Sequence, residues 1–191
     1  MFADASVWFT TPVGRVTVAA HGRGAAPPSA AITASSTRSD LPLPKDMTLD
    51  GAVACDVRGV CAGDGSLRIC LTVDPVGAAS AAEPNSGEHL DCAIIEGNGG
   101  QLALGVRDRD WMLSAGVHNG FLPERFAAAR SQPIDSEIAD YRVAYVARGL
   151  ELDVGPFAAG DRFRIPLALA WAPSRPDTLA SWFGVDAILP H

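Results

Sequence analysis

Acidic and histidine side chains gather in one part of the sequence, where they could support proton transfer. Asp108 and Asp110 flank an arginine, and His118 and Glu124 follow soon after. General acid–base catalysis needs one group that holds a proton and another that accepts it near neutral pH, and carboxylates and imidazole supply both. These four candidate catalytic residues predict a hydrolase or lyase with its site at one rim of the fold. A charged surface turn explains the same residues without catalysis.

Aromatic side chains offer a second kind of site. Trp111 follows Asp110 directly, and Trp182 and Phe183 form a pair near the C-terminus. Large aromatic rings stack on sugars and line apolar pockets, so these three are the candidate binding residues of a carbohydrate- or small-ligand-binding domain. Burial in the core is the simpler interpretation, because most aromatic side chains are buried. An exposed Trp182–Phe183 pair would instead mark a surface for a protein partner.

Metal and nucleophile signatures are weak. His89, Asp91 and Cys92 lie close together, but a catalytic zinc site needs three protein ligands. The four cysteines contain no C-x2-C pair, and free thiols are favoured over disulfides or metal ligation. These cysteines are Cys55, Cys61, Cys70 and Cys92. Because no nucleophile elbow, phosphate-binding loop or H-E-x-x-H helix occurs either, we expect no metal site and no cofactor.

The net charge of the chain limits its partners. It has 191 residues, a net charge of −7 and a pI of about 4.9. A field of this sign repels phosphate backbones, so we expect no nucleic-acid partner. No stretch approaches the ~20 consecutive apolar residues of a membrane helix, and the N-terminus lacks a secretory signal. We therefore expect a soluble, cytoplasmic protein with no membrane partner.

The elements that would position these residues are short strands. Every-other-residue alternation of large apolar side chains is the strongest signal in the sequence, and it is clearest from Phe163 to Trp171. The same period marks residues 53–57, 67–73, 102–106, 141–145 and 150–154, with weaker candidates at 7–9 and 16–18. Each segment is predicted to be a strand with one face in a core and the other wet or lightly covered.

The connections between these strands contain turn residues. Gly63-Asp64-Gly65 and residues 96–100 are typical of hairpin loops, and residues 155–161 join the last two strong strands over a short span. Such connections favour antiparallel pairing. Residues 22–47 and 74–88 are rich in small residues and proline, so both are predicted to be long irregular loops.

Together these patterns predict an all-β fold in which residues 1–191 form a single domain. We predict an antiparallel two-sheet sandwich of Ig-like or jelly-roll type, with a closed barrel as the alternative. One or two short helices are expected, over residues 122–130 and from about Asp177 to Trp182. Pro166 removes a ladder donor from the clearest strand, which predicts that this strand lies at an edge or contains a bulge.

Because no chemical signature stands out, we favour a non-catalytic binding or assembly module that acts through protein–protein contacts. Its partner would be another protein or a second copy, and an edge strand favours a homo-oligomer. The hydrolase or lyase and the ligand-binding domain are the alternatives. Convergence of Asp108 and His118 in a cleft would favour the enzyme, and an apolar pocket roofed by tryptophan would favour the ligand-binding domain.

Overall fold

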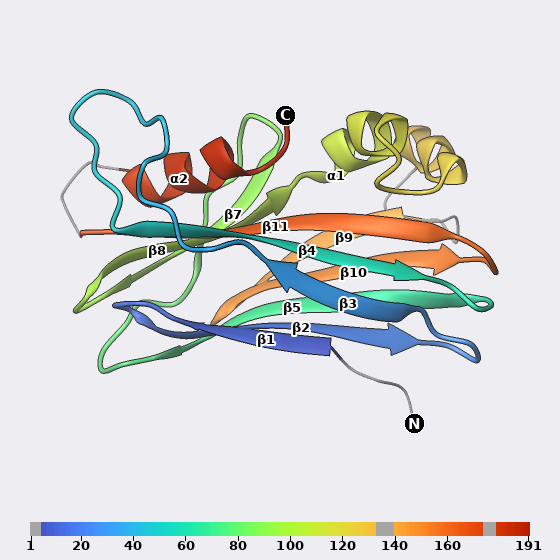
Figure 1. Ribbon diagram of the computed structural model, residues 1–191, viewed down its shortest axis with the longest axis horizontal. Helices are drawn as coiled ribbons and strands as arrows, with labels where there is room; N and C mark the ends of the chain where they lie inside the picture. The colour runs from blue at the N-terminus through green and yellow to red at the C-terminus, as the bar shows by residue number, and fades with distance from the viewer. Residues whose placement is uncertain (1–4, 133–139, 174–178) are drawn as a thin grey trace.

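Two antiparallel sheets face each other across an apolar core, as the computed structural model of the chain shows (Figure 1). The structure describes residues 5–132, 140–173 and 179–191. One sheet has the strand order β1-β2-β5-β10-β9 and the other the order β3-β4-β11-β8-β7-β6. The predicted all-β, two-sheet antiparallel sandwich is therefore confirmed.

The bounds of the strands follow the sheet order. The first sheet contains β1 (Ala5–Thr10), β2 (Gly14–Arg23), β5 (Gly65–Pro75), β10 (Gly149–Phe157) and β9 (Asp140–Val146). The second contains β3 (Ser29–Ala34), β4 (Gly51–Val60), β11 (Arg162–Ala172), β8 (Gly100–Arg107), β7 (Leu90–Gly97) and β6 (Glu83–Pro84). All the segments with clear or weak alternation are strands.

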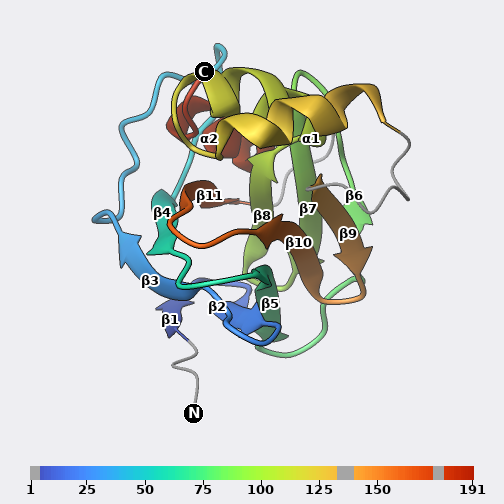
Figure 2. The same ribbon diagram turned by 90° about the vertical axis from the view of Figure 1, so that its right-hand side faces the viewer.

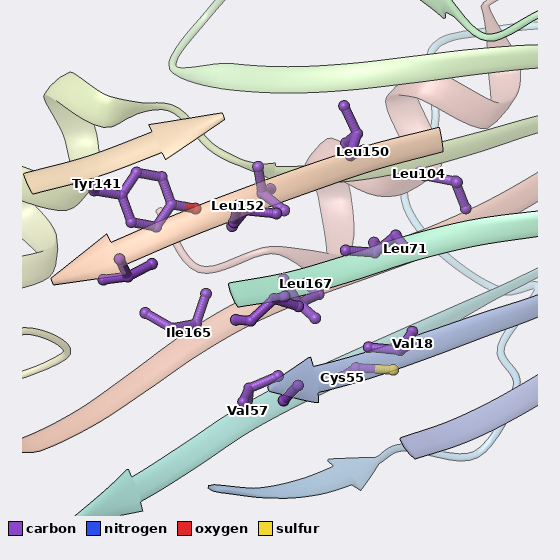
Figure 3. Packing of buried hydrophobic residues seen from close by; sticks show 14 of the residues in the cluster. Val18, Cys55, Val57, Leu71, Leu104, Tyr141, Leu150, Leu152, Ile165 and Leu167 are labelled. Carbon is purple, nitrogen blue, oxygen red and sulfur yellow. The ribbon is translucent and has the colours of Figure 1, made fainter. Parts of the chain in front are cut away.

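The alternating side chains fill the space between the sheets. Leu71 and Leu152 from the first sheet face Ile165 and Leu167 of β11, and all four are fully buried (Figure 3). Each side chain of this kind stabilises the fold by roughly 1.5–3 kcal/mol relative to an exposed position. The core between the sheets therefore accounts for the every-other-residue pattern.

The predicted hairpin at Gly63-Asp64-Gly65 is wrong. β4 belongs to the second sheet and β5 to the first, so this turn carries the chain from one sheet to the other. A Cβ on Gly65 would lie 2.7 Å from the carbonyl oxygen of Arg23, so the crossing needs glycine as a hairpin would. The segment between β10 and β11 also crosses between the sheets, whereas β7 and β8 form the expected hairpin.

The clearest strand is not at an edge. β11 lies between β4 and β8, and its ladder with β8 begins only at Leu167. Arg164, two residues before Pro166, directs its N–H to the carbonyl of Phe121 at 2.8 Å. Pro166 would direct a donor to the same side, beyond the β8 ladder, so its missing N–H breaks no strand pairing.

Strands also lie inside the two segments predicted to be irregular. β3 falls within residues 22–47, and the two-residue β6 falls within residues 74–88. β3 is an edge strand of small side chains with only one large apolar residue, Ile32. A strand that packs little surface leaves a weak pattern in the sequence, which is why composition concealed it.

Helices cover one end and one face of the sandwich (Figure 2). α1 (Arg109–Trp111), the π-helix η1 (Met112–Gly116) and the 3-10 helix η2 (Glu124–Ser131) form a cap at one end. α2 (Ala180–Ile188) packs on the outer face of the second sheet, over β8 and β11. The expected helices correspond to η2 and α2, although Asp177 lies outside the described residues. No helix in the described ranges is long and apolar enough to cross a membrane.

Candidate functional site

The four candidate catalytic residues do not gather at one site. Asp108 caps α1, where one carboxylate oxygen accepts a hydrogen bond from the Trp111 N–H at 2.7 Å. Its other oxygen lies 3.4 Å from Nδ1 of His89, an exposed histidine. Among the described residues, Asp108 has no hydrogen bond or ion pair with His118 or Glu124. The arrangement that would favour the enzyme is therefore not formed in this structure.

His118 and Glu124 do lie together, in a hollow on the helical cap. The cap has two helical segments: α1 continues directly into η1, and η2 follows after a turn. The hollow lies between these two segments and has a volume of about 560 Å³. Its lining consists of Leu113, Ser114, Val117, His118, Glu124, Ala127 and Arg130. Asp110 is exposed and does not line the hollow, but its carbonyl accepts a hydrogen bond from the Ser114 hydroxyl.

A second polar cluster lies where β7 faces β9. The Tyr145 hydroxyl donates to a carboxylate oxygen of Asp91 at 2.8 Å. Tyr141, on the same side of β9, is fully buried, and its hydroxyl has no partner in the described part of the chain. In Figure 3 that hydroxyl points in among the core side chains. The sequence pattern gave no signal for this cluster beyond the proximity of His89 to Asp91.

Electrostatics in this cluster favour neutral side chains. Burial raises the pKa of the Asp91 carboxyl, the Tyr145 hydrogen bond opposes that rise, and the charge of Asp108 adds to it. Burial also raises the pKa of Tyr145 and, well above its usual value, that of Tyr141. Asp91 is therefore the carboxyl of this cluster whose protonated form burial favours, and neither of the hollows at residues 113–130 and 78–98 includes these side chains.

The candidate binding aromatics are mostly covered. Trp111, at the end of α1, is 7% exposed and packs into the main core, and Trp182 is 6% exposed between α2 and the second sheet. The Trp182 indole N–H donates to the carbonyl of Asn85 at 3.3 Å. Phe183 is half-buried and packs edge-on against Trp182. Both tryptophans therefore contribute most of their surface to the two apolar clusters.

Thiols and metal ligands form no combined site. Cys55, Cys61 and Cys92 are buried, Cys70 is half-buried, and none is bonded to another cysteine. Burial raises the pKa of Cys55 to about 12 and that of Cys61 to about 11, so both stay protonated near neutral pH. Within the described ranges, no three histidine, cysteine or acidic side chains are placed to hold a metal ion.

An exposed feature that the sequence reasoning missed is the outer edge of β1. Trp8 is 57% exposed, the guanidinium of Arg15 lies 4.7 Å from its ring centroid, and the strand contains no charged residue. β1 pairs with β2 along one side and is the last strand of its sheet. The available signal was an uncharged segment with tryptophan at a position that alternates with the apolar Val7 and Phe9. This alternation covers only a few residues, so the segment was a weak strand candidate.

Comparison of the chain with known proteins adds no family assignment. No family model, curated protein or solved structure matches it.

Proposed function

We propose that this protein is a non-catalytic binding module that assembles with a second copy of itself through its β1 edge. The observation that carries the proposal is an uncharged edge strand that exposes Trp8. An edge strand offers unpaired N–H and C=O groups, and natural proteins guard such edges with charge, proline or short length. β1 has six residues and none of these guards.

The other described edges are better protected. β6 is two residues long and consists of Glu83 and Pro84. β9 carries Arg142, and the Ala82 N–H covers the carbonyl of Ala147 just beyond its end. β3 is also uncharged, but it exposes no large apolar side chain. β1 is therefore the edge that best combines free backbone groups with apolar surface.

Charge favours a second copy at this edge. Two chains of net charge −7 repel each other, so a self-contact requires a surface without negative charge. β1 has no acidic residue, and the positive guanidinium of Arg15 lies over the Trp8 ring. Antiparallel pairing of two β1 strands would give an isologous contact, in which Ser6, Trp8 and Thr10 of both copies share one face of a continuous sheet.

The oligomeric state of the full chain tests the proposal. Analytical ultracentrifugation and native mass spectrometry should show a species of twice the 19.9 kDa chain mass that dissociates on dilution. Trp8→Lys should weaken the dimer roughly 10-fold or more, because it removes an aromatic pair and places like charges across the two-fold axis. Monomer at every concentration would overturn the proposal.

A matched substitution distinguishes loss of the β1 contact from a general effect of added positive charge. Val76→Lys makes the same charge change at a side chain that is 72% exposed and outside β1. It should leave the dimer unchanged. Of the four tryptophans, Trp8 is the exposed one. Acrylamide should therefore quench the tryptophan fluorescence of the unsubstituted protein less in the dimer than in the monomer. Equal weakening by both lysine variants would argue against pairing through β1.

A further inference from the structure

We infer that the hollow on the helical cap binds a small zwitterion of dipeptide size, with its carboxylate at Arg130 and its ammonium group at Glu124. This inference is independent of the self-association through β1. The volume of the hollow, about 560 Å³, lies in the range typical of small-ligand sites, roughly 300–1,000 Å³.

The helices place the lining residues in two facing rows. Glu124, Ala127 and Arg130 are spaced by three residues on η2, and side chains at this spacing lie one above another on a 3-10 helix. The opposing row comes from η1 and the two helical residues that follow it. It consists of Leu113, Ser114, Val117 and His118. The floor is therefore apolar and the ends are polar.

A hydrogen bond fixes the direction of the two rows. The Arg109 guanidinium, at the start of α1, donates to the carbonyl of Ala129 near the end of η2 at 2.7 Å. The same guanidinium pairs with Asp140 at 2.8 Å. The two helical segments therefore run antiparallel, which places His118 and Glu124 at one end of the hollow and Arg130 at the other.

The charged groups around the hollow are available for a ligand. Among the described residues, the side chains of His118, Glu124 and Arg130 have no hydrogen bond or ion pair. Most other arginines in these ranges pair with a carboxylate, as Arg164 does with Asp56 at 2.7 Å. A guanidinium binds a carboxylate in bidentate fashion, and a carboxylate accepts from an ammonium group.

The length of the hollow sets the size of the ligand. With a rise of about 2.0 Å per residue, the Cα atoms of Glu124 and Arg130 lie about 12 Å apart. The termini of an extended dipeptide lie roughly 7 Å apart, and the long side chains of Glu124 and Arg130 span the remainder. Leu113, Val117 and Ala127 then contact the apolar part of the ligand.

The Ser114 hydroxyl gives the recognition a direction. It donates its proton to the carbonyl of Asp110, so towards the hollow it can only accept. It therefore suits a donor of the ligand, such as the peptide N–H, and cannot replace Arg130 as the group that binds the carboxylate.

Nuclear magnetic resonance titration of the full chain tests this inference with three probes. The probes are alanyl-leucine with free ends, its N-acetyl form and its C-terminal amide. Free alanyl-leucine should shift the backbone signals of residues 113–118 and 124–130. Arg130→Gln should weaken its binding roughly 3- to 10-fold and leave the affinity for the amide unchanged. Glu124→Gln should likewise weaken the binding of free alanyl-leucine and leave the affinity for its N-acetyl form unchanged.

Matched variants and the blocked peptides decide the outcome. Arg162→Gln and Glu83→Gln change the same charges at exposed positions outside the hollow, and neither should affect binding. The inference is overturned if the probe causes no shifts, or if the shifts lie away from the cap. Equal binding of free and blocked peptides, or equal losses in the matched variants, would also overturn it. A loss of binding in Trp8→Lys would tie the hollow to assembly and contradict its independence.

Discussion

At the scale of single residues, the two tyrosines of β9 show how one hydroxyl can stabilise the fold and another weaken it. Tyr145 donates to Asp91 at 2.8 Å, whereas Tyr141 is fully buried with no partner for its hydroxyl in the described structure. A buried polar group without a partner costs about 1–3 kcal/mol, and a satisfied hydrogen bond contributes about 1 kcal/mol.

The two tyrosines should therefore respond oppositely to loss of the hydroxyl. Tyr141→Phe should raise the free energy of unfolding by about 1 kcal/mol, and Tyr145→Phe should lower it by about the same amount. Urea denaturation followed by circular dichroism measures both. Destabilisation by Tyr141→Phe would show that its hydroxyl has a partner, such as a buried water molecule.

Asp91 should make stability fall as pH rises. Burial raises the pKa of this carboxyl in the folded state above the ordinary value of 3.8. Its contribution is fully present below pH 3.8 and is lost as pH rises through the folded pKa, because only the unfolded chain ionises freely. Asp91→Asn should therefore gain stability relative to the parent protein as pH rises to neutrality. Denaturation at a series of pH values measures this difference, and a constant difference would exclude the raised pKa.

Asp153 provides a control of opposite sign. The Arg68 guanidinium donates two hydrogen bonds to it, at 2.8 and 2.6 Å, and holds the pKa of this carboxyl below 3.8. Its contribution is present above pH 3.8 and is lost as pH falls through the folded pKa. Asp153→Asn should therefore be most destabilising at neutral pH, and its effect should shrink in acid.

At the scale of elements, the sequence predicted where strands occur better than it predicted what packs on each face of a strand. The alternation from Phe163 to Trp171 identified β11, and Gly97 to Gly100 identified a hairpin turn. β7 was less visible because both its faces are covered. Its Ile95 lies in the core between the sheets and its Ile94 beneath α2. A strand buried on both sides has no alternation to detect.

The covering of the second sheet by α2 was also missed. Ala168 and Ala170 of β11 gave the impression of a lightly covered face, yet both are fully buried under the helix. Small side chains there let the helix approach the sheet closely. Alanine in a sequence gives little indication of burial, because its small side chain is found at both buried and exposed positions.

Close contact between α2 and the sheet makes Gly105 a sensitive position. A Cβ added there would lie 2.3 Å from Cγ1 of Val185 on α2. Gly105→Ala should lower the free energy of unfolding by about 1–3 kcal/mol, because the helix must shift outward. Gly87→Ala is the matched control, since a Cβ at Gly87 meets nothing within 4 Å. Equal stability of the two variants in thermal or urea unfolding would argue against this packing.

The candidate sites were less predictable than the elements, because they depend on how helices and strands pack against one another. The sequence placed His118 and Glu124 near each other, but Arg130 joins them only through the antiparallel arrangement of the cap. Asp108 was selected as an acid or base, yet its carboxylate is occupied as a helix cap. Capping residues and catalytic residues are the same types, so the sequence alone does not separate these roles.

At the scale of the whole molecule, the net charge of −7 acts against self-association. Added salt screens repulsion between two acidic copies, while the contact proposed through uncharged β1 depends little on salt. The dimer dissociation constant should therefore decrease as sodium chloride increases, as measured by sedimentation equilibrium. An increase with salt would indicate that opposite charges hold the copies together.

Arg107 determines where a reporter can be attached to this chain. It is 1% exposed, and it donates to Asp186 and to the carbonyls of Leu189 and Pro190. Removal of residues 189–191 would take the two carbonyl acceptors from this buried guanidinium, and a fluorescent fusion at that end would disturb the same contacts. The opposite terminus leads into β1. An internal label at Gly87 avoids both contacts, because a side chain added there meets nothing within 4 Å of its Cβ.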